Sequence, residues 1–155
     1  MEKWFAEEVE APLRTRGVSM TLKMVKVDNK LKKPGPVFNA ITKVAYDMGA
    51  DYIYRVNDDT EMAGPWARRM MDELGRLDPP NLGAVGPLCK QGNVKILTHD
   101  FTHRTHMEVF GGLYYPRELV DWWMDDWISR VYGSRRTRQG ASVAVVHHTG
   151  AHGQR

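Results

Sequence analysis

The chain has 155 residues, 42% of them hydrophobic, and its 22 Lys and Arg against 19 Asp and Glu give a net charge of +3. This length predicts one domain over residues 1–155, the apolar content excludes a mainly disordered chain, and the small basic excess argues against a nucleic-acid partner. The single cysteine, Cys89, excludes an internal disulfide framework, and no apolar run approaches the roughly 18 residues of a membrane span. We therefore expect a soluble chain with no membrane segment.

The first half of the chain alternates between helical and strand patterns. Apolar spacing predicts helices over Glu2–Leu13, Val37–Met48 and Trp66–Leu77, and strands over Val18–Val27, Asp51–Val56 and Gly83–Pro87. The breaker Pro34-Gly35-Pro36 separates the first strand from the second helix. Such alternation predicts a layered α/β fold in which crossover helices pack on the faces of a sheet.

The second half of the chain is less regular. Lys95–Thr105 mixes β-branched residues with three histidines, and a helical pattern runs from Pro116 to Val131. A final strand is expected over Ala141–Val146, directly before His147-His148.

Asn57-Asp58-Asp59 follows the second predicted strand directly. In open α/β sheets ligands bind at the carboxyl ends of strands, so this motif lies where a site is expected. Two carboxylates beside an amide oxygen offer the hard ligands that suit Mg²⁺ or Mn²⁺, whose shell is often completed by substrate phosphates. The structural alternative is an Asx-rich turn with solvated acids.

A second acidic pair, Asp125-Asp126, lies between tryptophans in Trp122–Trp127. Indole neighbours can partly desolvate a carboxylate and raise its pKa toward the range useful for proton abstraction. The alternative is a helix whose tryptophans face the core while the acids face water.

The histidines form two groups, and the paired glycines form a third weak signal. His99, His103 and His106 have helical spacing that would suit zinc, but the neighbouring threonines disfavour a helix there. His147 and His148 end a strand, where either could supplement an oxygen-rich metal site or simply be solvated. Gly111-Gly112 is typical of a turn, or lets backbone amides approach a bound sugar.

Taken together, these segments resemble the nucleotide-sugar-dependent glycosyltransferases of the GT-A fold. The resemblance covers roughly Leu22 to His152: a helix with Asn39 near its start, a strand, the acidic motif, Phe110-Gly111-Gly112, Asp125-Asp126 and a C-terminal histidine follow the family's order. It implies a three-layer α/β/α sandwich with a mostly parallel mixed sheet. The region around His106 and Trp122–Gly133 is also similar to glycosyltransferase-like regions of large eukaryotic, especially algal and protist, proteins.

The resemblance also implies roles for individual residues. Asp58, Asp59 and His148 would bind Mn²⁺ or Mg²⁺, which bridges the diphosphate of a UDP- or GDP-sugar. Asp126 would take the proton of an acceptor hydroxyl in an inverting transfer while Asp125 positions the acceptor, which is a glycan, a protein or a small molecule. The predicted substrate-binding residues are Asn39, Asn57, Gly111, Gly112 and Trp127.

Two departures from the family pattern keep alternatives open. Asn57 replaces the first aspartate of the DxD-type motif, and the chain begins where the family's first nucleotide-binding strand would already have passed. The alternatives are a non-catalytic or truncated glycosyltransferase-like binding module and a metal-dependent phosphohydrolase. Golgi lumen and cytoplasm are both compatible locations for a full-length protein.

Overall fold

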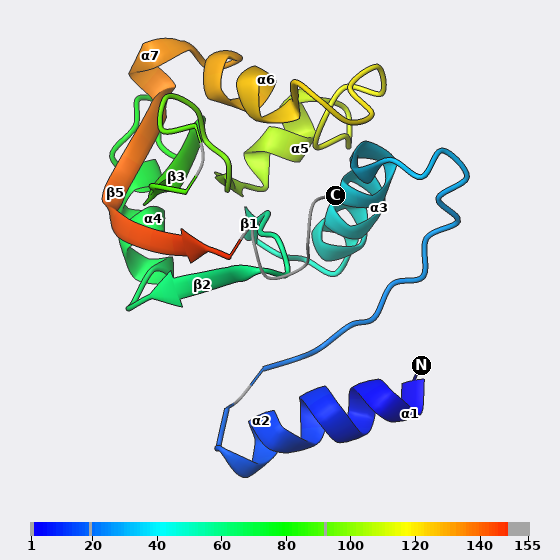
Figure 1. Ribbon diagram of the computed structural model, residues 1–155. Helices are drawn as coiled ribbons and strands as arrows, with labels where there is room; N and C mark the ends of the chain where they lie inside the picture. The colour runs from blue at the N-terminus through cyan, green and yellow to red at the C-terminus, as the bar shows by residue number, and fades with distance from the viewer. Residues whose placement is uncertain (1, 19, 92, 149–155) are drawn as a thin grey trace.

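The computed structural model describes residues 2–18, 20–91 and 93–148, and its centre is a curled five-stranded sheet (Figure 1). The strands are β1 (Tyr52–Tyr54), β2 (Thr60–Ala63), β3 (Ala84–Cys89), β4 (Phe101–His103) and β5 (Thr137–His147). Their order in the sheet is β1-β4-β3-β5-β2. The chain is therefore mixed α/β, as the alternating pattern predicts.

The prediction of a mostly parallel sheet is wrong. β3 and β5 pair in parallel, whereas β1 with β4, β3 with β4, and β2 with β5 pair antiparallel. The pattern misled because β4 follows β3 through residues 90–100 without an intervening helix, so β4 returns beside β3 in the opposite direction. A connection without a crossover helix allows this antiparallel return.

Apolar residues on the two faces of the sheet form two separate cores. One includes Ala84 of β3 and the buried side chains of α5 (Thr105–Val109) and α6 (Met124–Arg130), with Phe38 of α3 (Pro34–Asp47) packed against it. The other includes Val85 and the buried face of α4 (Ala67–Gly75). Because successive strand residues point to opposite faces, Ala84 and Val85 mark the two sides.

Helix α3 confirms the predicted helix over Val37–Met48 but begins earlier, at Pro34. Proline is tolerated in the first helical turn because its missing N–H would have no intrahelical partner there. The breaker cluster therefore forms the helix start. The Gly35 N–H donates to the Val120 carbonyl at 2.8 Å, which joins this helix start to the loop before α6.

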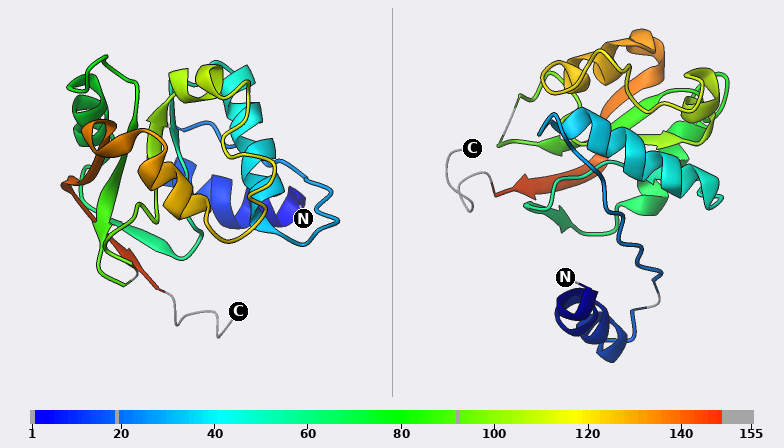
Figure 2. Two further views of the ribbon diagram at one scale, coloured as in Figure 1. Left: turned by 90° about the horizontal axis from the view of Figure 1, so that it is seen from above. Right: turned by 90° about the vertical axis from the view of Figure 1, so that its right-hand side faces the viewer.

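The N-terminal helical segment lies apart from the sheet (Figures 1 and 2). It comprises α1 (Glu2–Phe5), the π-helical η1 (Ala6–Glu10) and α2 (Ala11–Thr15), and an extended segment then leads to α3. The predicted strand over Val18–Val27 is wrong within the described residues, since none of them enters a strand. Strand-like alternation alone does not form a strand unless a sheet edge supplies a hydrogen-bonding partner.

The predicted long helix from Pro116 to Val131 is confirmed only in its last part, α6. A loop precedes it, α7 (Gly133–Arg136) follows it, and β5 then extends beyond the predicted Ala141–Val146. None of the helices in residues 2–18, 20–91 and 93–148 is long and apolar enough to cross a membrane.

Candidate functional site

The acidic motif forms the connection between β1 and β2. Asn57, Asp58 and Asp59 follow the buried Arg55 and precede Thr60, the first residue of β2. Thr60 pairs with His147 in the antiparallel ladder, so the end of β5 lies beside the acidic motif. Two segments separated by nearly ninety residues are thereby brought together.

Asp59 and His147 make the closest contact in this place. His147 Nε2 lies 2.9 Å from Asp59 Oδ1, and the two side chains are 17% and 11% exposed. Asp59 Oδ1 is buried, and no hydrogen-bond donor among the described residues is aligned with it. The Asn57 amide lies 3.4 Å from the same ring nitrogen. A buried carboxylate oxygen, an imidazole nitrogen and an amide therefore converge.

The predicted metal ligand His148 is placed elsewhere. Its Nε2 lies 3.1 Å from Glu61 Oε2 in an exposed pair, and its backbone N–H donates to the Asp59 carbonyl at 2.8 Å. Successive side chains of a strand point to opposite faces, so His147 and His148 cannot both reach Asp59. The geometry thus favours the neighbouring histidine as the partner of Asp59.

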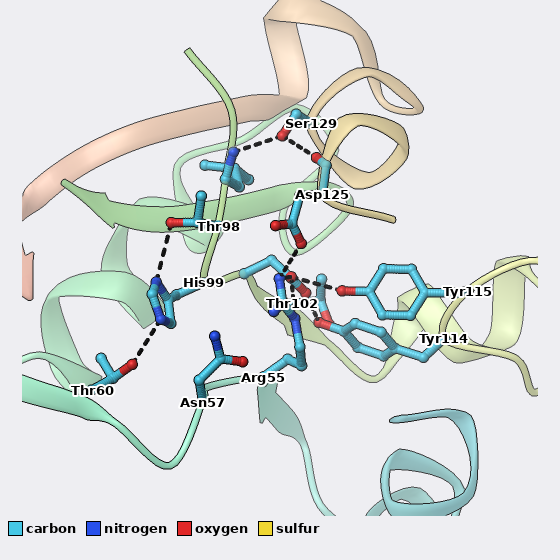
Figure 3. A network of polar contacts seen from close by, with 12 residues as sticks. Arg55, Asn57, Thr60, Thr98, His99, Thr102, Tyr114, Tyr115, Asp125 and Ser129 are labelled. Carbon is cyan, nitrogen blue, oxygen red and sulfur yellow. Dashed lines mark hydrogen bonds and ion pairs between the residues drawn. The ribbon is translucent and has the colours of Figure 1, made fainter. Parts of the chain in front are cut away.

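A buried cation joins this motif to the second acidic pair. The Arg55 guanidinium donates to Asp100 Oδ1 through Nε at 2.9 Å and through Nη2 at 2.6 Å, and Nη2 also donates to Asp125 Oδ1 at 2.7 Å (Figure 3). Arg55 and Asp100 are almost completely buried. A buried charge is tolerated when it is paired and hydrogen-bonded, as Arg55 is here.

Two tyrosines complete the shell around Asp100. The Tyr114 hydroxyl donates to Asp100 Oδ2 at 2.5 Å and the Tyr115 hydroxyl donates to Oδ1 at 2.8 Å. Burial and the Asp100 carboxylate raise the pKa of both tyrosines well above the ordinary value, which keeps these hydroxyls protonated as donors. The network fixes Arg55, and Arg55 in turn holds Asp125.

The two predicted catalytic carboxylates lie on different faces of α6. Burial raises the pKa of Asp125 to about 6, although the Arg55 guanidinium acts in the opposite direction. Asp126 instead faces away and pairs with Arg130 one turn later, at 2.8 Å. Asp125 is therefore the carboxylate whose pKa suits a general base near neutral pH.

Three predicted substrate-binding residues have structural roles in the fold. Asn39 Oδ1 accepts the backbone N–H groups of Tyr114 and Tyr115, and its Nδ2 donates to the Tyr115 carbonyl at 3.0 Å. Gly111 and Gly112 have φ of +63° and +83°, and the Gly112 N–H donates to the Met107 carbonyl at 2.7 Å. These glycines end α5 in the left-handed conformation that favours glycine.

The remaining aromatic and histidine predictions separate in space. Trp127 packs against Phe110 with ring centroids 5.0 Å apart and lies at the edge of the core. His99 Nε2 lies 2.8 Å from the Thr60 hydroxyl, and burial lowers its pKa to about 4. His106 instead bonds the Tyr132 hydroxyl and the Tyr114 carbonyl. The helical zinc motif over His99, His103 and His106 is therefore not formed.

Arg55, Asp100, Tyr114 and Tyr115 were not singled out by sequence. An arginine inside the β-forming run Asp51–Val56 was one available signal, because a charged residue in a short buried strand needs a partner. Asp100 lies in a run of β-branched residues and histidines, where its burial could not be read from periodicity.

No group of three or more His, Cys, Asp or Glu side chains converges on one point in the part of the chain that the structure describes. A Mg²⁺-type site does not require one, since it commonly uses one or two carboxylates with water and substrate phosphates.

Comparisons of this chain with protein-family models, curated proteins and solved structures found no match. The resemblance to GT-A glycosyltransferases therefore depends on the motifs, and a function must be argued from the site itself.

Proposed function

We propose that this chain is a metal-dependent glycosyltransferase domain of GT-A type, which moves a sugar from a UDP- or GDP-sugar to an acceptor hydroxyl with inversion. The observation that carries the proposal is the contact between Asp59 and His147. The acidic motif and a C-terminal histidine meet, as the resemblance requires, and they meet around a buried carboxylate oxygen without an aligned donor.

Asp59 and His147 would hold the divalent cation, with Asp58 and Asn57 beside them. Carboxylate oxygen together with one imidazole nitrogen suits Mn²⁺, and Mg²⁺ is the alternative for an oxygen-rich shell. When bound, the cation would supply Lewis-acid stabilisation of the nucleotide diphosphate leaving group. The sequence-based hypothesis assigns His148 as the histidine ligand, whereas the geometry favours His147.

Asp125 would accept the proton of the attacking hydroxyl. Its pKa of about 6 allows it to be ionised at neutral pH and still to retain basicity. Arg55 fixes the carboxylate at 2.7 Å and also follows β1 directly, in the segment that leads into the acidic motif. This assignment exchanges the roles expected of Asp125 and Asp126.

The second candidate is a non-catalytic module of the same fold type. The observation that favours it is that Asn39, Gly111 and Gly112, which were expected to contact substrate, serve backbone contacts and a helix end. A module of this kind would bind no nucleotide in a cation-dependent manner.

Calorimetric titration of UDP and GDP, each with and without Mn²⁺, separates the two candidates. We expect nucleotide binding that requires Mn²⁺, and we expect Asp59→Asn and His147→Ala each to weaken it at least about tenfold, because each removes a ligand. His148→Ala is the matched control, since its side chain lies on the opposite face and should leave affinity unchanged.

Two results would contradict the proposal. The first is the absence of Mn²⁺-dependent binding of either nucleotide to the unmodified chain. The second is an equal loss of nucleotide affinity in His147→Ala and His148→Ala, because the contact with Asp59 would then not distinguish the two histidines.

A further inference from the structure

The start of α6 exposes two adjacent indole rings. Trp122 is 81% exposed and Trp123 is 69% exposed, although tryptophan is usually highly buried. Trp123 also has φ of +74°, a left-handed conformation that is an outlier for a bulky residue. An exposed aromatic pair of which one member, Trp123, has a strained backbone needs a reason, because folding alone would favour burial and a relaxed backbone.

Contacts with α3 hold this loop in place. Lys33 Nζ lies 2.6 Å from Asp121 Oδ2, and the Gly35 N–H bonds the Val120 carbonyl. The Trp123 carbonyl accepts the Trp127 N–H at 2.8 Å, which begins α6. The indoles are therefore presented from a fixed backbone, and a ligand would not have to order the loop on binding.

An open groove of about 380 Å³ runs along the same surface. It is lined by Leu119, Trp123, Asp126, Trp127, Arg130 and Val131. Its walls are mainly apolar, and its polar groups belong to the Asp126–Arg130 pair. The volume falls within the range of small-ligand sites, which combine apolar walls with a few polar groups that orient the ligand.

We propose that this groove binds a pyranose ring of an oligosaccharide, and that the acceptor of the transfer is therefore a glycan. A pyranose has an apolar C–H face whose positive hydrogens fit the negative face of an indole, and hydroxyl groups around its edge. Asp126 accepts hydrogen bonds and Arg130 donates them, so the pair complements those hydroxyls. This inference extends the proposed function, and the role of the glycan as acceptor rests on that function.

The groove shares one turn of α6 with the proposed base, although Asp126 lines the groove and Asp125 lies on the other face of the helix. Asp125 and Asp126 are neighbours in the first turn of α6, so one carboxylate lies in the buried network while the next lies in the groove. A sugar stacked on Trp123 would project its edge toward this turn. Asp126 then becomes an acceptor-positioning residue, and Asp125 remains the proton acceptor.

A second copy of the chain is a less suitable occupant. A stable protein interface buries about 800 Å² on each partner and is depleted of charge at its centre. Here the short apolar groove contains the Asp126–Arg130 pair, and the Lys33–Asp121 pair anchors the adjacent loop. Groups of this kind favour a small, hydroxyl-rich ligand.

The test is a titration of the full chain with tetrasaccharides of β1,4-linked glucose, β1,4-linked N-acetylglucosamine and α1,2-linked mannose. Intrinsic tryptophan fluorescence and calorimetry are measured without metal or nucleotide. We expect at least one tetrasaccharide to bind, and Trp123→Gly, which removes the indole that lines the groove, to weaken it at least tenfold. Glycine at position 123 removes the indole and accepts the positive φ, so the fold is retained.

Trp4→Ala is the matched control, because Trp4 is also exposed, at 60%, but lies on the separate N-terminal segment. Its affinity should equal that of the unmodified chain. Failure of all three tetrasaccharides to bind, an equal loss in the control, or a dimer in solution that Trp123→Gly dissociates would overturn the inference.

The outcomes for the two proposals are separable. Tetrasaccharide binding without Mn²⁺-dependent nucleotide binding would retain the glycan site and remove the transferase. Nucleotide binding without tetrasaccharide binding would retain the transferase and remove the glycan acceptor.

Discussion

Asp125 experiences two opposing influences on its charge. Burial disfavours the carboxylate and the Arg55 guanidinium favours it, and burial is the larger effect, so the pKa rises from 3.8 to about 6. The stability contribution of His99 changes with pH in the opposite direction, because burial lowers its pKa from 6.5 to about 4 and keeps the ring neutral. Two groups close to the acidic motif therefore give stability contributions that change in opposite directions with pH.

The Asp125→Asn variant isolates the contribution of this carboxyl. The folded chain binds the Asp125 proton more tightly than the unfolded chain, so this stabilisation is complete below about pH 4 and is lost as the pH rises through about 6. Relative to Asp125→Asn, the unmodified chain should lose about 1 kcal/mol of unfolding free energy between pH 4 and pH 7, a value reduced because the side chain is 36% exposed.

Urea unfolding at four pH values between 4 and 7 measures this difference. His99 is present in both proteins, so its opposite contribution cancels. Parallel stability curves for the two proteins would show that Asp125 titrates in the folded chain as it does in the unfolded one.

At the level of secondary structure, the junction of α3 with the loop before α6 depends on the absence of one side chain. A Cβ atom at Gly35 would lie 2.5 Å from the Leu119 carbonyl oxygen and 2.9 Å from Val120 Cα, both backbone atoms. The same junction carries the tryptophan-bearing loop. Packing of two elements and presentation of the proposed glycan groove are thus determined by the same contact.

We expect Gly35→Ala to destabilise the chain by about 2 kcal/mol, because the added methyl forces α3 and the loop apart. Gly75→Ala at the end of α4 is the matched control. No atom lies within 4 Å of its added Cβ, so it should be neutral or stabilise the fold by up to about 1 kcal/mol. Thermal or urea unfolding measures both, and equal effects would contradict the close approach at Gly35.

The elements that the sequence predicts correctly are those with strong local signals. The helix over Val37–Met48 and the strand within Asp51–Val56 have clear periodicity and clear end residues. Direction in the sheet is different, because it depends on which strands pair after the chain folds. The buried Arg55–Asp100 pair also joins residues 45 apart, and local pattern carries no information on such a contact.

For the molecule as a whole, stability is expected to be uneven. The segment from Glu2 to Thr15 lies away from the sheet, and the extended segment after it has few hydrogen bonds (Figure 2). The two hydrophobic cores consist of residues from Phe38 onward. The free energy of local opening should therefore be lowest before α3.

Limited digestion with trypsin tests this expectation. We predict that the first cuts fall in the extended segment, after Lys23, Lys26, Lys30 or Lys32, since Lys33 is followed by a proline that blocks trypsin. The remaining fragment from Lys33 onward should melt within about 3 °C of the intact chain, because little buried apolar surface is lost. Initial cleavage within the helices and strands after Pro34, or a much larger fall in melting temperature, would contradict it.

β5 contains a bulge whose length affects where the residues after it point. Pro87 pairs with Gly140 and the next residue, Leu88, pairs with Ala144, so three extra residues are accommodated around Ser142, whose φ is +53°. The facing of every residue after this bulge is set by the number of residues within it. One residue fewer would bring His148, and one residue more would bring Val146, to the place beside Asp59 that His147 occupies. The chemical identity of the candidate metal site is thus encoded in the length of a bulge several residues away, where no ligand lies.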